Sequence, residues 1–285
     1  MESAESREPI IGIDLGTTHS IVAVCDGAGP RVIEGPSGER LLPSAVRYSN
    51  GRVDAVGSEA RRRAAEFPGE TILSSKRWMG RSFAESHVLG SGFEFGIVQG
   101  PRGLAALRAG AATVLPQEVG AVILAELRAW AEQSLGRSVH QAVITVPAYF
   151  DDGQRQATRD AARLAGLEAV RLVPEPTAAA LAYGLGRSTH AETIVVYDFG
   201  GGTFDVSVLA VTPDDGSGTG AMFRVLATSG DTQLGGDDID RKVCERLLGE
   251  AGLGSEGFTS AALPPPARQA LRDFAESTKS ALSAQ

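Results

Sequence analysis

The chain has 285 residues, of which 42% are hydrophobic and 22% are charged. This composition excludes a disordered or low-complexity chain, and the length is enough for one large domain or two small ones. The net charge of −8 argues against a general nucleic-acid or membrane binder, whose surface would be basic. Glycine is frequent, at 35 residues, which indicates many tight turns or close approach of the backbone to a ligand.

The sequence offers little for disulfide or metal–thiolate chemistry. Its two cysteines, Cys25 and Cys244, form no C-x-x-C motif and cannot build a disulfide framework. The histidines show no metal-ligand spacing, and we interpret them as structural or surface residues: His19, His87, His140 and His190. We find no signal-peptide pattern and no apolar run long enough to span a bilayer. We therefore expect a cytoplasmic protein with neither nucleic acid nor membrane as a partner.

The first half of the chain mixes strands and helices. Its predicted elements are strands at Ile10–Asp14 and Ser20–Asp26, a mixed region at Arg31–Tyr48, a helix at Gly57–Ala65 and a glycine-punctuated loop with a short strand at Gly90–Gly103. The clearest element is an amphipathic helix over Pro116–Gly136, with Val119, Ile123 and Leu127 on one face. Pro116 suits the first turn of this helix and Gly136 suits the position after its end.

The second half continues the alternation of strands and helices. Its predicted elements are a strand at Ala142–Val146, helices at Gly153–Ala165 and Thr177–Tyr183, strands at Thr193–Asp198, Phe204–Val211 and Phe223–Thr228, and a helix at Asp237–Leu248. A last helix begins after Pro264–Pro266 and continues to Gln285 without a C-cap signal. We therefore expect the sequence to stop inside or at the edge of an element.

Two segments far apart in the chain share one pattern. Ile11–Thr18 and Val195–Thr203 each consist of a strand, an aspartate, one apolar residue and a small-residue turn with a threonine, and each precedes a second β-branched strand. A single copy is compatible with a plain β-hairpin. Two copies in one chain predict two related lobes that face each other.

The residue types of this repeat suit polyphosphate binding. A turn of small residues exposes successive backbone N–H groups to an anion, and glycine lets the backbone approach phosphate oxygens closely. Asp14 and Asp198 could hold Mg²⁺ through water molecules, because Mg²⁺ loses its hydration shell reluctantly. The pattern therefore predicts that one turn from each lobe clamps a nucleoside triphosphate. The sequence contains no G-x-x-x-x-G-K-[ST] motif, so the site is not a Walker P-loop.

Three further residues are candidates for phosphoryl-transfer chemistry. Lys76 is by spacing alone compatible with a surface lysine, but it could neutralise phosphate charge. Glu175 lies between two prolines at a helix start, where it is either an ordinary helix-start carboxylate or a site carboxylate. Asp205 follows Thr203 by two residues and is either a strand-edge residue or a group that orients the attacking water.

Several long segments resemble the ATPase domain of the DnaK-type heat-shock chaperones. They are Ile11–Val24, Val143–Thr158, Glu175–Leu185, Tyr197–Ser207 and Leu226–Asp240. The resemblance extends over nearly the whole chain, from Ile10 to Ser283. Within this family, Ser74–Ser82 and Asp151–Leu167 are most similar to the HscA branch, which serves iron–sulfur cluster assembly.

The resemblance implies an α/β fold of the actin-like, ribonuclease H-like type, with two lobes around an ATP·Mg²⁺ cleft. It implies that Asp14 and Asp198 hold the Mg²⁺ shell and that Lys76, Glu175, Asp205 and Thr203 act in hydrolysis. The implied contacts to ATP or ADP are Gly16, Thr17, Thr18, Gly200, Gly201, Gly202, Thr203, Glu276, Lys279 and Ser283.

The resemblance also implies how the domain communicates. Pro147 and Arg155 match the pair that relays the nucleotide state toward a peptide-binding domain, and Arg171 matches a contact with the J-domain co-chaperone. A client protein and an iron–sulfur scaffold protein are further implied partners. Two residues depart from the family pattern. Pro174 replaces a usual Asn beside the co-chaperone surface, and Ser280 replaces a common Arg beside adenine.

The resemblance further implies a division of the chain. We expect residues 1–190 to form the first lobe, with a small subdomain inserted at about 42–116, and residues 191–285 to form an incomplete second lobe. The segment that closes over adenosine and the peptide-binding domain are absent from the sequence. We therefore expect this chain to bind ATP weakly.

Other functions remain as alternatives at this point. The chain could be a truncated, catalytically weak fragment that still contacts J-domain proteins. An actin-fold sugar kinase and an actin-like filament protein are less favoured, because segments such as Val146–Thr158 match the chaperones.

Overall fold

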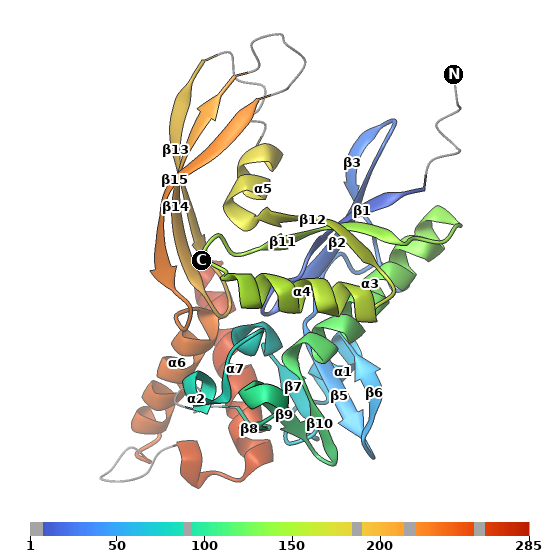
Figure 1. Cartoon of the computed structure of the whole chain (residues 1–285). Helices are drawn as coiled ribbons and strands as arrows, with labels where there is room; N and C mark the ends of the chain where they lie inside the picture. The colour runs from blue at the N-terminus through green and yellow to red at the C-terminus, as the bar shows by residue number, and fades with distance from the viewer. Residues whose placement is uncertain (1–7, 88–92, 184–189, 214–220, 254–259, 285) are drawn as a thin grey trace.

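The computed structural model describes residues 8–87, 93–183, 190–213, 221–253 and 260–284. Within these residues, helices and strands form four sheets with helices packed around them (Figure 1). Two of the sheets carry the repeated pattern of the sequence. The turns of these two sheets define the candidate site.

The largest sheet contains the first copy of the repeat. Its strand order is β12 (Glu168–Pro174), β11 (Gln141–Val146), β1 (Ile10–Asp14), β2 (His19–Asp26) and β3 (Gly29–Val32), and the short β4 (Leu42–Pro43) pairs with β2. β1, β2 and β3 are antiparallel neighbours, whereas β11 and β12 run parallel to β1. The parallel strands require crossover connections, which helices provide.

Helices cover the largest sheet. α3 (Pro116–Leu135) and α4 (Asp152–Leu164) pack against each other on one face, and α5 (Glu175–Ala182) lies on the other (Figure 1). α3 ends at Gly136, which has a φ of 66°, a conformation that favours glycine. α4 begins with a capping box, in which the Asp151 side chain accepts a hydrogen bond from the Gln154 N–H.

Two small sheets fill the region between β4 and α3. One has the strand order β6 (Arg52–Val56), β5 (Ala45–Ser49), β7 (Thr71–Leu73), and the other has the order β10 (Ala112–Val114), β9 (Ala105–Ala109), β8 (Gly96–Gln99). The short helices of this region are α1 (Ser58–Arg62), α2 (Phe83–His87) and the 3₁₀ turns at Ser75–Trp78 and Pro101–Gly103. Trp78 is buried and makes edge-to-face contacts with Phe93 and Phe95. This aromatic cluster anchors the 3₁₀ turn that contains Lys76.

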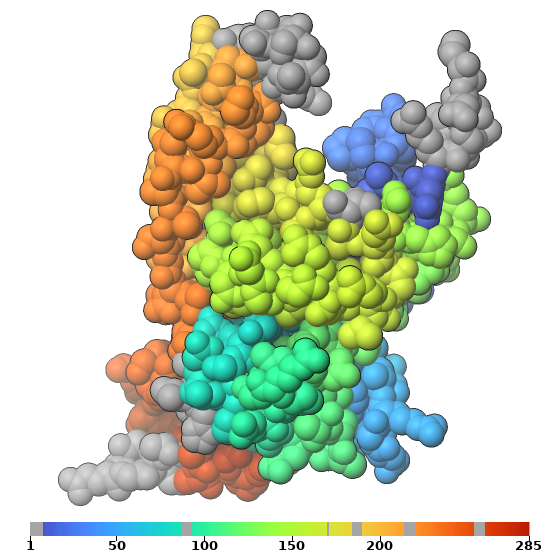
Figure 2. Space-filling model, in the orientation of Figure 1, coloured from blue at the N-terminus to red at the C-terminus, as the bar shows by residue number. Residues whose placement is uncertain are grey.

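The second copy of the repeat lies in the sheet of β13 (Glu192–Phe199), β14 (Phe204–Thr212) and β15 (Met222–Asp231), which are antiparallel in this order. β15 runs along the outer side of the molecule (Figure 2). A further 3₁₀ turn, Ser260–Ala262, lies between α6 (Gly236–Glu250) and α7 (Pro265–Ser283), and these two helices pack against each other. β1–β3 and β13–β15 are therefore both three-stranded antiparallel units with the Asp-containing turn after the first strand.

Most predicted elements are confirmed, with differences at their ends. The helix predicted at Gly57–Ala65 is shorter, because Gly57 has a φ of 66° and precedes the helix and Arg63 ends it. The strand predicted at Phe223–Thr228 extends to Met222–Asp231, since its neighbour β14 continues the pairing to Asp231. The two small sheets were largely missed, because their strands are only three to five residues long.

Candidate functional site

The two repeated turns pack directly against each other. A Cβ atom built on Gly201 would lie 1.7 Å from the Thr18 Oγ1, and one on Gly202 would lie 2.5 Å from the Thr17 Cγ2. Only glycine fits at such distances, so the second turn needs Gly201 and Gly202 to reach the first. Within the first turn, a Cβ on Gly16 would lie 2.1 Å from the His19 carbonyl oxygen. The prediction that the two turns face each other is confirmed.

The start of α6 supports the second turn. The backbone N–H of Gly236 donates to the Gly200 carbonyl at 2.9 Å, and that of Asp237 donates to the Gly201 carbonyl at 2.8 Å. A Cβ on Gly235 would lie 2.6 Å from the Gly201 carbonyl carbon. The sequence analysis missed Gly235 and Gly236 as parts of the site. The signal was available as the adjacent glycines at the start of the predicted helix.

Lys76 and Glu175 form a buried ion pair at this junction. The Lys76 Nζ donates to the Glu175 Oε1 at 2.7 Å, and the two side chains are 9% and 16% exposed. Burial alone would lower the pKa of Lys76, but the negative charges of Glu175 and Asp14 outweigh it and raise the pKa. Lys76 is therefore a buried, paired lysine rather than a surface one, and it stays charged.

Asp205 is buried without a partner in the part of the chain that the structure describes. Neither of its carboxylate oxygens has a hydrogen-bond partner there. Burial, together with the negative charges of Glu175 and Asp198, raises the pKa of Asp205 to about 7. A carboxyl group that titrates near neutral pH is suited to accept or hold a proton from a water molecule.

Asp14 is the last residue of β1, and Asp198 is the last residue but one of β13. The Thr145 hydroxyl donates to the Asp14 Oδ1 at 2.7 Å. Burial, and then the charge of Asp14, raise the pKa of Asp198. A divalent cation would relieve this repulsion between carboxylates, so the donor set fits Mg²⁺, which prefers oxygen ligands. Among the described residues no group of three or more acidic, His or Cys side chains surrounds a single point.

Two adjoining open pockets meet at the paired turns. The first, of about 480 Å³, contains both repeat aspartates and the Lys76–Glu175 pair. The second, of about 650 Å³, is lined by the start of α6 and by Glu276, Lys279, Ser280 and Ser283 of α7. Both volumes lie in the range of small-molecule sites. The residues that line both pockets are Thr18, His19, Gly200 and Gly201.

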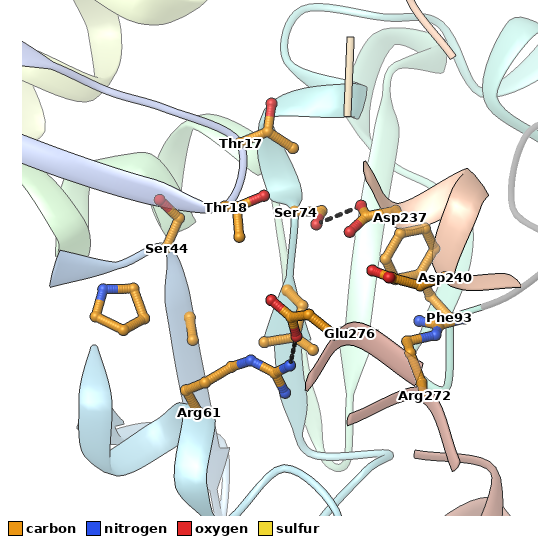
Figure 3. Close-up of a pocket in the computed structure, with 13 residues that line it drawn as sticks. Thr17, Thr18, Ser44, Arg61, Ser74, Phe93, Asp237, Asp240, Arg272 and Glu276 are labelled. Atoms are coloured by element: carbon orange, nitrogen blue, oxygen red, sulfur yellow. Dashed lines mark hydrogen bonds and ion pairs between the residues drawn. The ribbon is translucent and has the colours of Figure 1, made fainter. Parts of the chain in front are cut away.

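α7 faces α1 across a smaller enclosed pocket, drawn in Figure 3. Arg61 of α1 forms ion pairs with Asp273 and Glu276 of α7. The Ser74 hydroxyl donates to the Asp237 Oδ2 at 2.9 Å (Figure 3). These contacts join the inserted small sheets to α6 and α7. Glu276, which the sequence analysis placed at the ligand, therefore also pairs with Arg61.

The three remaining predicted residues lie outside the two open pockets. Arg155 of α4 donates from its Nε to the Phe150 carbonyl at 2.9 Å, and the Phe150 N–H donates to the Pro147 carbonyl at 3.2 Å. The centre of the Phe150 ring lies 5.9 Å from the Lys76 Nζ, so Pro147 and Arg155 are both linked to a residue beside the ion pair. Arg171 lies on β12 and is exposed.

No helix in the described parts of the chain is long and apolar enough to cross a membrane. The geometry of the site instead indicates a ligand with an extended anionic portion. Paired small-residue turns, a buried lysine and carboxylates that suit Mg²⁺ adjoin a second pocket large enough for another part of the same ligand.

Comparison with known proteins agrees with this arrangement. The family model described as Hsp70 protein matches residues 10–285. The chain is 48% identical over 278 residues to a "Chaperone protein HscA homolog" of Bordetella petrii and 49% identical over 280 residues to one of Bordetella pertussis. These alignments cover 97% and 98% of this chain but 42% of each relative, so the chain spans less than half the length of these relatives. On the match to the family model, the chain belongs to the Hsp70 family.

Proposed function

We propose that this chain is the ATP-binding and ATP-hydrolysing part of a chaperone, and that it couples the nucleotide state to the binding of client proteins. The single observation that carries the proposal is the direct packing of the Gly200–Thr203 turn on the Thr17–Thr18 turn. The packed turns lie beside the buried Lys76–Glu175 pair. Membership of the Hsp70 family supports the same function.

The proposed fold is the actin-like, ribonuclease H-like arrangement of two lobes. Residues 1–190 would form the first lobe, with the small sheets at about 42–116 as its insertion, and residues 191–285 would form part of the second. The matching antiparallel units β1–β3 and β13–β15 support this division. The contacts between Arg61 and α7 would then join the insertion to the second lobe.

In this function the paired turns hold the phosphates. Backbone N–H groups of Gly16–Thr18 and Gly200–Thr203, with the threonine hydroxyls, would donate to phosphate oxygens. The Thr18 Oγ1 is buried and has no hydrogen-bond partner in the described structure, which suits a donor that awaits an anion. Asp14 and Asp198 would hold Mg²⁺, which neutralises phosphate charge when bound.

Hydrolysis needs an oriented water molecule and a neutralised γ-phosphate. Lys76 is held by Glu175 at a fixed position and would supply positive charge to the transferring group. Asp205, whose pKa is raised to about 7, would orient the attacking water and accept its proton. Thr203 lines the pocket that contains the Lys76–Glu175 pair, and its hydroxyl would position the γ-phosphate.

The second pocket would hold adenosine. Glu276, Lys279 and Ser283 line one of its walls from α7, and the Lys279 Nζ pairs with the Asp240 Oδ1 at 2.7 Å. Ser280, which replaces an arginine common in the family, also lines this wall. We therefore expect weak stacking on adenine from α7.

The proposed partners are assigned from one exposed arginine and from two residues near the ion pair. Arg171 is exposed on β12 and would contact a J-domain co-chaperone. Pro147 and Arg155 are both hydrogen-bonded to Phe150, which lies beside Lys76, and would relay the state of the γ-phosphate toward a peptide-binding domain. The similarity to HscA homologs supports a role in iron–sulfur cluster assembly, with a cluster scaffold protein as client.

Single-turnover hydrolysis of ATP tests the proposal. Thr203→Ala removes a hydroxyl from the second turn and is expected to slow hydrolysis at least tenfold, which corresponds to the loss of about one charge-assisted hydrogen bond. Thr212→Ala is the matched control, because Thr212 is exposed at the far end of the same strand. Equal rates for the two variants would contradict the assignment of the second turn to the phosphates.

A further inference from the structure

Arg77 directly follows Lys76 in the same 3₁₀ turn, but it has no part in the proposed chemistry. Its side chain is 11% exposed and extends toward the start of α6, where its Nη2 donates to the Asp238 Oδ2 at 2.9 Å. Lys76 pairs instead with Glu175. Two consecutive residues of one turn are therefore bound to different parts of the molecule.

The Arg77 guanidinium also contacts the second turn. Its Nη2 donates to the Gly201 carbonyl at 3.4 Å, and that carbonyl also accepts the Asp237 N–H at 2.8 Å. A Cβ atom built on Gly202 would lie 2.7 Å from the Arg77 Nε, so the Gly201–Gly202 peptide lies directly against the arginine. Because this peptide is trans, the Gly202 N–H points in the opposite direction to the Gly201 carbonyl. Arg77 and α6 therefore set the direction of an N–H group of the second turn.

Two carboxylates hold Arg77 in this position. The Asp238 Oδ2, which accepts from Arg77, also accepts the N–H of Gly235 at 3.0 Å, and Gly235 packs on the second turn. The Asp237 Oδ2 lies 3.4 Å from the Arg77 Nη2 and accepts the Ser74 hydroxyl. Both carboxylates are mostly buried, with 23% and 21% of their side chains exposed. Loss of the arginine would thus leave two neighbouring negative charges without their nearest positive charge.

Arg77 lines neither of the two open pockets, so it acts on a ligand through the second turn. We propose that Arg77 is a positioning residue for hydrolysis, which locks the Gly201–Gly202 peptide to the 3₁₀ turn that carries Lys76. This inference rests on the proposed function, because it requires that Lys76 and the second turn act on the same phosphate chain. Both groups stabilise the transition state only if they reach it together, so their relative position matters most during phosphoryl transfer.

This role requires an arginine and not merely a positive charge. The planar guanidinium presents its donors in a fixed fork, so it bonds the Gly201 carbonyl and the Asp238 carboxylate together. Arg77→Lys would keep a positive charge near Asp237 and Asp238, but its flexible stem would not hold the peptide in one orientation. The stability of the protein and its rate of hydrolysis should therefore respond differently to this change.

Single-turnover hydrolysis at saturating Mg²⁺·ATP, together with urea unfolding, tests the inference. Arg77→Gln is expected to unfold at a lower urea concentration and to hydrolyse ATP about tenfold more slowly than the wild type. Arg77→Lys should recover most of the urea midpoint, because the charge remains, while its hydrolysis stays about tenfold slow. Arg241→Lys is the matched control, because Arg241 pairs with Asp238 at 3.9 Å from an exposed position. It should leave the midpoint and the rate unchanged.

The outcomes separate the inference from the proposed function. If Arg77→Lys hydrolyses ATP as fast as the wild type, charge alone suffices and the inference is wrong. The inference is also wrong if the rates of the two Arg77 variants simply follow their urea midpoints, or if Arg241→Lys is equally slow. In these cases the proposed function stands as long as Thr203→Ala is slower than Thr212→Ala. If neither Thr203→Ala nor the Arg77 variants slow hydrolysis, both proposals fail.

Discussion

The two repeat units share a turn but differ in the support beneath it. In β1, Ile11 and Ile13 are 0% and 1% exposed, whereas in β13 the side chains of Val195 and Tyr197 are 64% and 67% exposed. Helices cover the sheet of β1, and the sheet of β13–β15 has large apolar side chains open to solvent. The same local pattern is thus fixed by a packed core in one unit and mainly by its contacts to the first turn and to α6 in the other.

This difference indicates how the site is assembled. The first turn has support besides its contact with the second, because its strands are part of the main hydrophobic core. The second turn depends on the close approach of Gly201 and Gly202 to Thr18 and Thr17. Changes in the first unit should therefore act mainly on stability, and changes in the second mainly on the site.

Truncation of the buried strand should have the largest effect. Ile13→Ala is expected to lower the free energy of unfolding by about 3 kcal/mol, the usual cost of a cavity in a core. Val195→Ala, at an exposed position of the corresponding strand, should cost less than about 1 kcal/mol. Urea unfolding followed by tryptophan fluorescence reports on the main hydrophobic core, because Trp78 and Trp130 are buried in the same cluster as Ile13. If both variants lowered the free energy of unfolding equally, the two repeat units would not differ in how strongly their strands support the fold.

A methyl group at the contact between the turns should have the next largest effect. Gly201→Ala places a Cβ against the Thr18 hydroxyl and is expected to cost about 2 kcal/mol, as for overpacking of a tight contact. It should also weaken ADP binding in a calorimetric titration. Gly27→Ala is the control, since no atom lies within 4 Å of its added Cβ. Unchanged ADP binding in Gly201→Ala would mean that the two turns do not act together.

Asp205, in the second repeat unit, should make the stability of the ligand-free protein depend on pH. The pKa of Asp205 is about 7 in the folded protein against the usual aspartate value of 3.8, so between these two pH values the folded state holds more protons than the unfolded state. Stability should therefore fall as the pH rises from 4 to 7. Half of the free energy that corresponds to this pKa shift is roughly 2 kcal/mol.

Asp205→Asn tests this expectation, because an amide does not titrate. Urea midpoints of the wild type and the variant should differ more at pH 8 than at pH 4, with the variant the more stable protein at pH 8. Parallel pH curves for the two proteins would show that Asp205 ionises in the folded state as it does in the unfolded chain.

The smallest effect on stability is expected from loss of the ion pairs between α1 and α7. Arg61 pairs with Asp273 and Glu276, but all three side chains are partly exposed, so Arg61→Ala should cost less than about 1 kcal/mol. The measurable consequence is a wider gap between unfolding curves recorded by tryptophan fluorescence and by circular dichroism. Arg62→Ala, at the exposed neighbouring position of α1, should leave that gap unchanged.

Much of the site could be predicted from the sequence because its motifs are local. The Asp-x-Gly-Thr pattern fixes a strand, a carboxylate and a turn within a few residues, and these local features were confirmed around Asp14 and Asp198. The long helix α3 was equally clear, because periodicity and its terminal Pro116 and Gly136 agree. Short strands such as β9 and β10 lacked such signals.

The sequence by itself determined the type of elements, the repeat and the resemblance to DnaK-type chaperones, because each depends on spacing along the chain. Only the tertiary structure decided which side chains meet. It turned Lys76 from a candidate surface residue into the partner of Glu175 at 2.7 Å, and it left Asp205 buried without a partner among the described residues. It also brought Arg77 against the Gly201–Gly202 peptide of the second turn. The physical reason is that burial, charge and contact arise between residues far apart in sequence, and no local pattern encodes their distances.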